Sequence, residues 1–177
     1  PDVIITRFSM EPGITHGHHT ASTSLAKEAF DAAADPTQFP QQLEFVEPWA
    51  AKRLIWNAST RHFSRSDTKF DLSRLLQVDT GIYNPLLGAS YSEIAAQSRS
   101  AHKTQGFGAT PVLGEAIEYF VHLDGAPTTE SMLAGIDSSW QRVPGSEPVA
   151  AAISRALAAF DPQTPDASVL ALIEAHK

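Results

Sequence analysis

Short apolar runs alternate with a helical pattern over the first 125 residues, and this alternation limits the possible folds more than any other feature. The segments 2–6 (DVIIT) and 51–57 (AKRLIWN) have the β-branched and apolar content of buried strands. Between them, apolar side chains recur at helical spacing from about Thr20 to the ADP segment, with charged side chains on the other side. Strands that alternate with helices predict an α/β layered fold.

Two further strands are expected in the first part of the chain. The segment 74–81 is apolar enough for a third strand, and 115–125 has the alternation and aromatic content of a fourth. The segment 35–49 is rich in proline and polar residues, which predicts a surface excursion with one helical turn. The polar and basic segment 58–71 is expected to be a loop or a hairpin.

The rest of the chain is predicted to be helical. In the segment 88–108, Ser90 and Glu93 have capping-box spacing, and Gly106 and Gly108 are expected to end that helix. Three more helices are expected behind the fourth strand, and the last has Thr164 as its cap and Pro165 at its first position. Their predicted ranges are 128–139, 147–160 (with Val149, Ile153, Leu157 and Phe160 on one face) and 165–177.

Composition excludes several classes of protein. A chain of 177 residues, 42% of them hydrophobic, can bury the core of one globular domain. The net charge of −7, with 13 basic and 20 acidic residues, argues against a nucleic-acid partner. No apolar run approaches the roughly 20 residues that a membrane span needs. Because there is no cysteine, any metal must be held by histidine and carboxylate side chains. A chain without cysteine is compatible with the cytoplasm, the periplasm or secretion, so the compartment is not determined.

Three histidines stand in the segment ITHGHHTAS, between the first predicted strand and the first predicted helix. Open α/β sheets bind ligands where strands end and helices begin. A catalytic zinc takes three protein ligands and a water, so His19 can supply one ligand and His16 could lie near the same ion. The neighbouring sequence offers no acidic partner, and the residues alone leave a metal site and exposed loop histidines equally open.

Five segments in succession resemble the downstream part of the PIG-L, or LmbE-like, family of zinc-dependent de-N-acetylases, in particular its large bacterial multidomain members. This resemblance covers roughly residues 1–125 and implies a Rossmann-like fold whose first strand–helix units are missing. It divides the chain into residues 1–126, the end of the deacetylase domain, and 127–177, a helical extension. The segments are PDVIITRFSMEPGITHGHHTAS, DPTQFPQQL, PWAAKRLIWN, YNPLLGASYSEIAAQSRSAHKTQGFG and EYFVHLDG.

The resemblance assigns roles to the histidines. The family's later motif, His-Pro-Asp-His, corresponds to HGHH, which makes His19 the zinc ligand and His16 the catalytic residue that stabilises the oxyanion. Gly17 replaces the usual proline, and His18 replaces the usual aspartate, whose implied role is to orient or tune the neighbouring histidine. The AHKTQ segment resembles a helix motif near the family's active site, which places His102 and Gln105 beside the substrate, with a buried polar cluster as the alternative.

Arg7, close after the first strand, is a further candidate for a substrate contact, although an ion pair at the strand end is the stronger explanation. The family's first motif, His-Pro-Asp-Asp, supplies two zinc ligands and the general base, and it would precede residue 1. The chain is therefore expected to be a piece of a longer protein, and its partners are expected to be the missing N-terminal part and a small N-acetylated substrate.

The implied activity is the zinc-dependent removal of an N-acetyl group from an N-acetylated sugar or a related amide, with the chain alone inactive or nearly so. An alternative is a non-catalytic carbohydrate-binding or scaffolding domain that keeps the deacetylase fold. A third possibility is that the missing half is a separately cleaved chain that stays associated.

Overall fold

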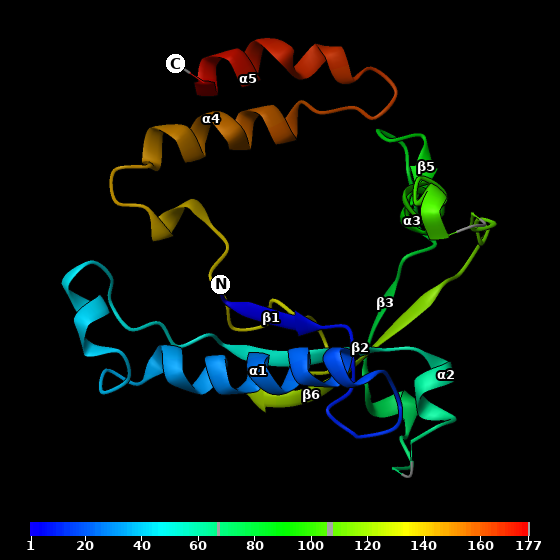
Figure 1. Cartoon of the computed structure of the whole chain (residues 1–177). Coiled ribbons are helices and arrows are strands. Elements are labelled where there is room, and N and C mark those ends of the chain that lie inside the picture. Colours follow the sequence, from blue (N-terminus) through cyan, green and yellow to red (C-terminus); the bar gives the residue numbers. More distant parts are fainter. Residues whose placement is uncertain (67, 106–107, 177) are drawn as a thin grey trace. The chain divides into compact units, whose positions relative to one another are not determined.

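The computed structural model describes residues 1–66, 68–105 and 108–176 (Figure 1). These residues form two units, which we call unit 1 and unit 2. Unit 1 comprises Pro1–Asp79 and Ile117–Ile136, and unit 2 comprises Thr80–Ala116 and Asp137–Lys177. The division of the chain at residue 126 that the family resemblance implies stays a prediction.

Unit 1 is built on a four-stranded mixed sheet with the strand order β1-β2-β6-β3. Strands β1 and β2 are parallel, whereas β6 is antiparallel to both of its neighbours, β2 and β3. All four predicted strands are present, and the mixed α/β fold is confirmed. Their bounds are Val3–Thr6 for β1, Arg53–Ala58 for β2, Leu76–Asp79 for β3 and Ile117–Gly125 for β6.

Strand β2 lies in the middle of the sheet, and its apolar residues are buried. Leu54 and Ala58 have no exposed surface, and Ile55 and Trp56 are each 3% exposed. Such a continuous apolar run is expected for a strand that is covered on both faces. The core of unit 1 gathers around this strand, and its members are Ile55, Leu76 and Phe120, with Val3, Val78 and Met132 packed against them.

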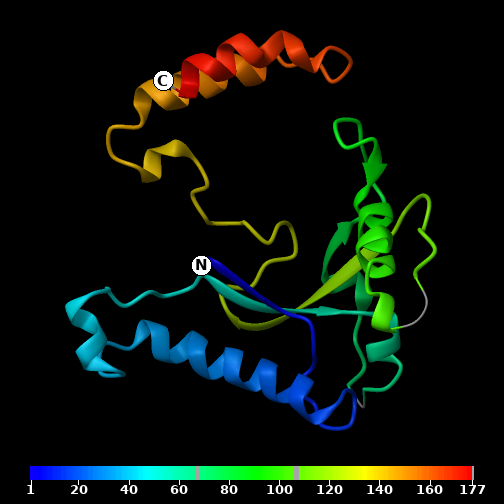
Figure 2. The same ribbon diagram turned by 45° about the horizontal axis from the view of Figure 1, so that its top comes forward.

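Helix α1 (Gly17–Ala34) connects the two parallel strands, as a parallel pair requires a crossover. Figure 2 shows the chain leaving β1, turning through the loop 7–16 and entering α1. The helix ends at the predicted place, but it begins three residues before Thr20. The single helical turn that was predicted in the following excursion is present as the 3₁₀ helix η1 (Pro40–Glu44).

The prediction of a loop or hairpin at 58–71 is wrong in part, because a short helix, α2 (Thr60–Phe63), follows β2 directly. Its last residue, Phe63, packs edge-on against Trp56 of β2, with ring centroids 6.2 Å apart. Phe70 packs against the same tryptophan at 6.3 Å. These aromatic contacts hold the segment against the sheet, although its own sequence is polar and basic. A second 3₁₀ helix, η2 (Leu72–Arg74), leads into β3.

The helix predicted at 128–139 is not formed. Arg53 of β2 is only 1% exposed, and its guanidinium donates hydrogen bonds to the carbonyl oxygens of Ser131, at 3.1 Å, and Ala134. The backbone at residues 132–135 forms turns rather than a helix, and Gly135 adopts a left-handed conformation with φ of +70°. A long-range contact thus overrides the local helical pattern.

Unit 2 contains a two-stranded ladder, β4 (Tyr83–Asn84) with β5 (Ala89–Ser90), followed by α3 (Tyr91–Ser100). The predicted capping box is confirmed: the Glu93 amide donates to the Ser90 hydroxyl, and the Ser90 amide donates to the Glu93 carboxylate at 2.8 Å. The helix ends earlier than predicted, before His102, and the 3₁₀ helix η3 (Lys103–Gln105) follows. Gly106, one of the two predicted stop residues, lies outside the described residues.

The end of unit 2 is helical, as predicted. Helices α4 (Glu147–Ala158) and α5 (Val169–His176) pack against each other, after 3₁₀ helices η4 (Trp140–Arg142) and η5 (Pro165–Ser168) respectively. The predicted apolar face of α4 is wrong in part, because Leu157 is 71% exposed and the buried residues are Ala152 and Ala156. Pro165 begins its helix as expected, but Thr164 does not cap it and bonds to Asp161 instead. None of the described helices combines the length and the apolar character that crossing a membrane requires.

We predict that Arg53→Met lowers the free energy of unfolding by about 2 kcal/mol, because two carbonyl groups then lose their donors inside the protein. Urea unfolding of the variant and the wild type measures the difference. Arg74→Met, at an exposed position, serves as the control and should change stability by less than about 0.5 kcal/mol. Equal stability of the Arg53 variant and the wild type would show that burying the guanidinium costs as much as its hydrogen bonds contribute.

Candidate metal centre

The three histidines stand at the first turn of α1, just beyond the carboxyl end of β1. His16 is the residue before the helix, and its carbonyl accepts hydrogen bonds from the amides of His19, at 2.9 Å, and Thr20, at 3.0 Å. Because α1 begins at Gly17, His18 and His19 belong to its first turn. One helix end therefore carries all three imidazoles.

The imidazole rings lie close enough together to share an ion. One ligand nitrogen from each of His16, His18 and His19 lies within 4.8 Å of the other two. Nitrogens that bind one tetrahedral zinc ion are roughly 3.3 Å apart, as bond lengths of about 2.0–2.1 Å require. His16 and His18 are exposed, so modest rotations of their side chains would close the difference. Within the described part of the chain, the imidazole nitrogens of these residues have no hydrogen-bond partner that competes with an ion.

His19 is held more firmly than the other two. Its ring stacks on Phe8, with centroids 3.9 Å apart and an angle of 2° between the planes. The fully buried Thr23, one turn later in α1, donates its hydroxyl to the Phe8 carbonyl at 2.7 Å. Phe8 and Thr23 thus position the His19 ring. Sequence reasoning missed both, although Thr23 follows His19 by four residues and so lies on the same side of the helix.

The surroundings favour neutral His19. Partial burial lowers the pKa of the His19 imidazole below its ordinary value of 6.5, and the nearby His18 and His16 rings lower it further. A metal ligand must be unprotonated, so a lowered pKa keeps His19 ready to bind at neutral pH. The donor set fits zinc, because neutral imidazoles are among its preferred ligands.

A pocket of about 310 Å³ adjoins the histidines. Three basic residues that follow β2, Arg61, His62 and Arg65, form part of its wall. Partial burial lowers the pKa of the His62 imidazole, and the positive charges of Arg7, Arg65 and Arg61 lower it further. The lining residues are Gly13, Ile14, Thr15, His16, His19, Arg61, His62 and Arg65, and this described set includes no carboxylate.

Of the other predicted residues, Arg7 has protein partners in unit 1, and His102 and Gln105 belong to unit 2. Arg7 donates to the carbonyl and the side-chain oxygen of Asn57, at 3.1 and 2.5 Å, and pairs with Glu118 at 3.9 Å. His102 lies just after α3 in unit 2, exposed, with its Nδ1 3.2 Å from the Ser98 carbonyl. Gln105 belongs to η3, and its side chain lies outside the described residues.

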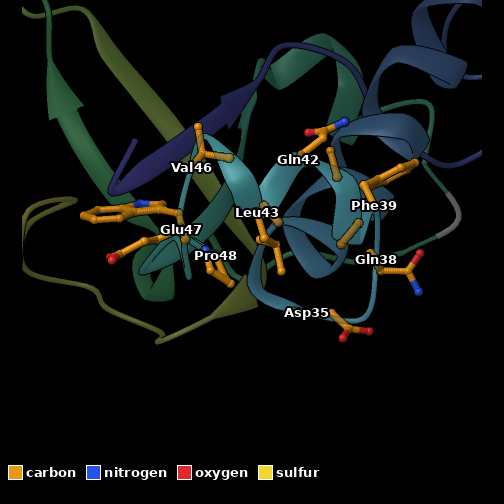
Figure 3. Close-up of a pocket in the computed structure, with 12 residues that line it drawn as sticks. Asp35, Gln38, Phe39, Gln42, Leu43, Val46, Glu47 and Pro48 are labelled. Carbon is orange, nitrogen blue, oxygen red and sulfur yellow. The ribbon is translucent and has the colours of Figure 1, made fainter.

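A second pocket, of about 330 Å³, lies between the end of α1 and η1 (Figure 3). Its lining is largely apolar and includes Phe39, Leu43, Val46 and Trp49. None of the predicted site residues lines it, and it offers no cluster of titratable groups comparable with the three histidines.

Comparison with protein-family models, curated proteins and solved structures finds no match to this chain. The family resemblance therefore rests on the sequence motifs alone.

In the metal-free protein, we predict that the His19 imidazole titrates below pH 6.5, because burial and the two neighbouring rings disfavour its charged form. Since the folded pKa lies below the unfolded one, folding should become less favourable as the pH falls from the unfolded value toward the folded one. NMR titration of the histidine ring signals measures the midpoint.

Replacing His18 by glutamine should raise the His19 midpoint, because one of the neighbouring rings that lower it is gone. The His176→Gln variant, changed at an exposed position in unit 2, is the control and should leave the midpoint where it is. A His19 midpoint at or above 6.5 in the wild type would contradict this description of its surroundings.

Proposed function

We propose that this chain carries the histidine part of a zinc centre in a hydrolase that removes an N-acetyl group from an N-acetylated sugar or related amide. The observation that supports it is the group of three imidazole nitrogens within 4.8 Å of one another, at the start of α1. The fold of the complete domain, on this proposal, is Rossmann-like, as the motif succession implies.

His19 is the zinc ligand in this proposal, because its ring is already held in place by Phe8. His16 and His18 lie within reach of the same ion. A zinc ion in a site of this kind polarises a carbonyl group and lowers the pKa of a water molecule.

The chain's own residues then have distinct tasks. His16, at the start of the helix and 5.4 Å from His19 between ring centroids, donates a hydrogen bond to the oxyanion that forms when the amide carbonyl is attacked. His18 packs edge-on against His19 at 4.2 Å and, after partial burial, is the second cause that lowers the pKa of that ring. The general base and two further ligands come from the His-Pro-Asp-Asp motif that the resemblance places before residue 1.

A non-catalytic carbohydrate-binding or scaffolding domain is the second candidate, and one observation favours it. No carboxylate belongs to the histidine group or to the described lining of the adjoining pocket, and His18 replaces the family's usual aspartate. Without a carboxylate near the cluster, the chain has no evident general base of its own. Zinc binding without hydrolysis in the protein that contains the upstream motif would support this candidate.

The zinc site is tested on the chain itself. After treatment with a chelator and dialysis against zinc, the wild type should bind one zinc ion, and His19→Ala should weaken that binding by more than about tenfold, because a ligand is lost. Metal analysis and competition with a chromogenic chelator give the stoichiometry and the affinity. His176→Ala, which changes an exposed histidine of unit 2, should bind zinc like the wild type. No zinc binding by the wild type, or equal binding by the His19 variant, would refute the site.

The activity is tested in the protein that includes the His-Pro-Asp-Asp motif. That protein should release acetate from an N-acetylated sugar, whereas residues 1–177 alone should release none above background. His16→Ala should lower kcat by roughly a hundredfold or more, the usual cost of removing one oxyanion donor, while zinc content stays within error of the wild type. Unchanged kcat in this variant would remove His16 from the catalytic machinery.

A further inference from the structure

Two arginines line the pocket beside the histidines, although a zinc site needs no positively charged side chain. Arg61 lies in α2, and Arg65 lies in the turn that follows it, so both come from the segment after β2. The carboxyl ends of β1 and β2 are neighbours, because the two strands are parallel. The histidines after β1 and the arginines after β2 therefore line one pocket.

Neither arginine has a protein partner for its charge in the described part of the chain. The ion pairs there involve other residues, and the pocket lining includes no carboxylate. A guanidinium is a planar fork of donors that matches the oxygens of a phosphate or a carboxylate. Two such groups beside one pocket provide donors for a single oxyanion.

His62 adds a third donor. The Ser59 backbone amide donates a hydrogen bond to Nδ1 of His62, at 3.1 Å. Nδ1 is therefore the acceptor, and the neutral ring carries its proton on Nε2. The side chain can offer that N–H to a ligand in the pocket that it lines.

We propose that this pocket binds the oxyanion of a small molecule, a phosphate or a carboxylate group, through Arg61 and Arg65 with His62 as a third donor. The volume of about 310 Å³ suits a small ligand group. A nucleic acid is a poorer fit, because the whole chain carries a net charge of −7. Together with the proposed function, on which this step rests, the substrate is an N-acylated compound that bears an acidic group near the amide.

The experiment measures the binding of inorganic phosphate, and in a second arm of acetate, to metal-free protein by calorimetry at constant ionic strength set with chloride. The wild type should bind at least one of the two anions at one site. Arg61→Gln combined with Arg65→Gln should weaken that binding by at least about tenfold, because charge-assisted hydrogen bonds are lost. The anion that binds more tightly identifies the acidic group as phosphate or carboxylate.

Two matched variants distinguish specific anion binding in this pocket from a nonspecific effect of positive charge. Arg74→Gln combined with Lys103→Gln removes the same two charges from exposed positions outside the pocket and should bind like the wild type. Arg61→Lys combined with Arg65→Lys keeps the charge without the planar fork and should bind more weakly than the wild type. No anion binding above the chloride control, or equal affinity in the glutamine pair and the wild type, would overturn the proposal. Circular dichroism of each variant checks that it is folded.

Zinc binding, measured on the same samples, distinguishes failure of this inference from failure of the proposed function. Zinc binding without arginine-dependent anion binding overturns the oxyanion site and leaves the zinc centre standing. Arginine-dependent anion binding without zinc binding supports the oxyanion site and refutes the zinc centre.

Discussion

The parallel pairing of β1 with β2 is the constraint on which the candidate site depends. Strand β2 is buried in the middle of the sheet, and β1 is aligned with it from Val3 beside Arg53 to Thr6 beside Trp56. Parallel strands end at the same edge of the sheet, so the segments that leave them meet there. One segment carries the histidines into α1, and the other carries the basic residues of α2. Residues about 45 positions apart, such as His16 and Arg61, thereby line the same pocket.

This arrangement gives the site two chemically different halves. The half after β1 offers three imidazoles, one of them fixed by a stacked phenylalanine. The half after β2 offers guanidinium groups and a histidine whose tautomer follows from a backbone hydrogen bond. The positive charges of the arginines would repel a metal ion held by the histidines. An oxyanion between them would relieve that repulsion.

Sequence patterns predicted the parts of this molecule that depend on local or short-range order. The strands followed from their apolar residues, and the capping box at Ser90 and Glu93 followed from spacing alone. The helix expected at 128–139 failed because Arg53, far away in the chain, binds the carbonyls of Ser131 and Ala134. The histidine cluster was visible in the sequence because its members are adjacent. Thr23 could have been found from its helical spacing to His19, whereas only the folded chain brings Phe8 and the two arginines beside those histidines.

The most direct test of this account is X-ray absorption spectroscopy at the zinc edge of the zinc-loaded chain. The account predicts an ion bound at about 2.0 Å by the His19 imidazole, whose ligand nitrogen lies within 4.8 Å of those of His16 and His18. It also predicts that His19→Ala removes at least one imidazole from the spectrum. An ion bound only by oxygen ligands, or a spectrum that the His19 substitution leaves unchanged, would contradict the assignment of this cluster as a metal centre.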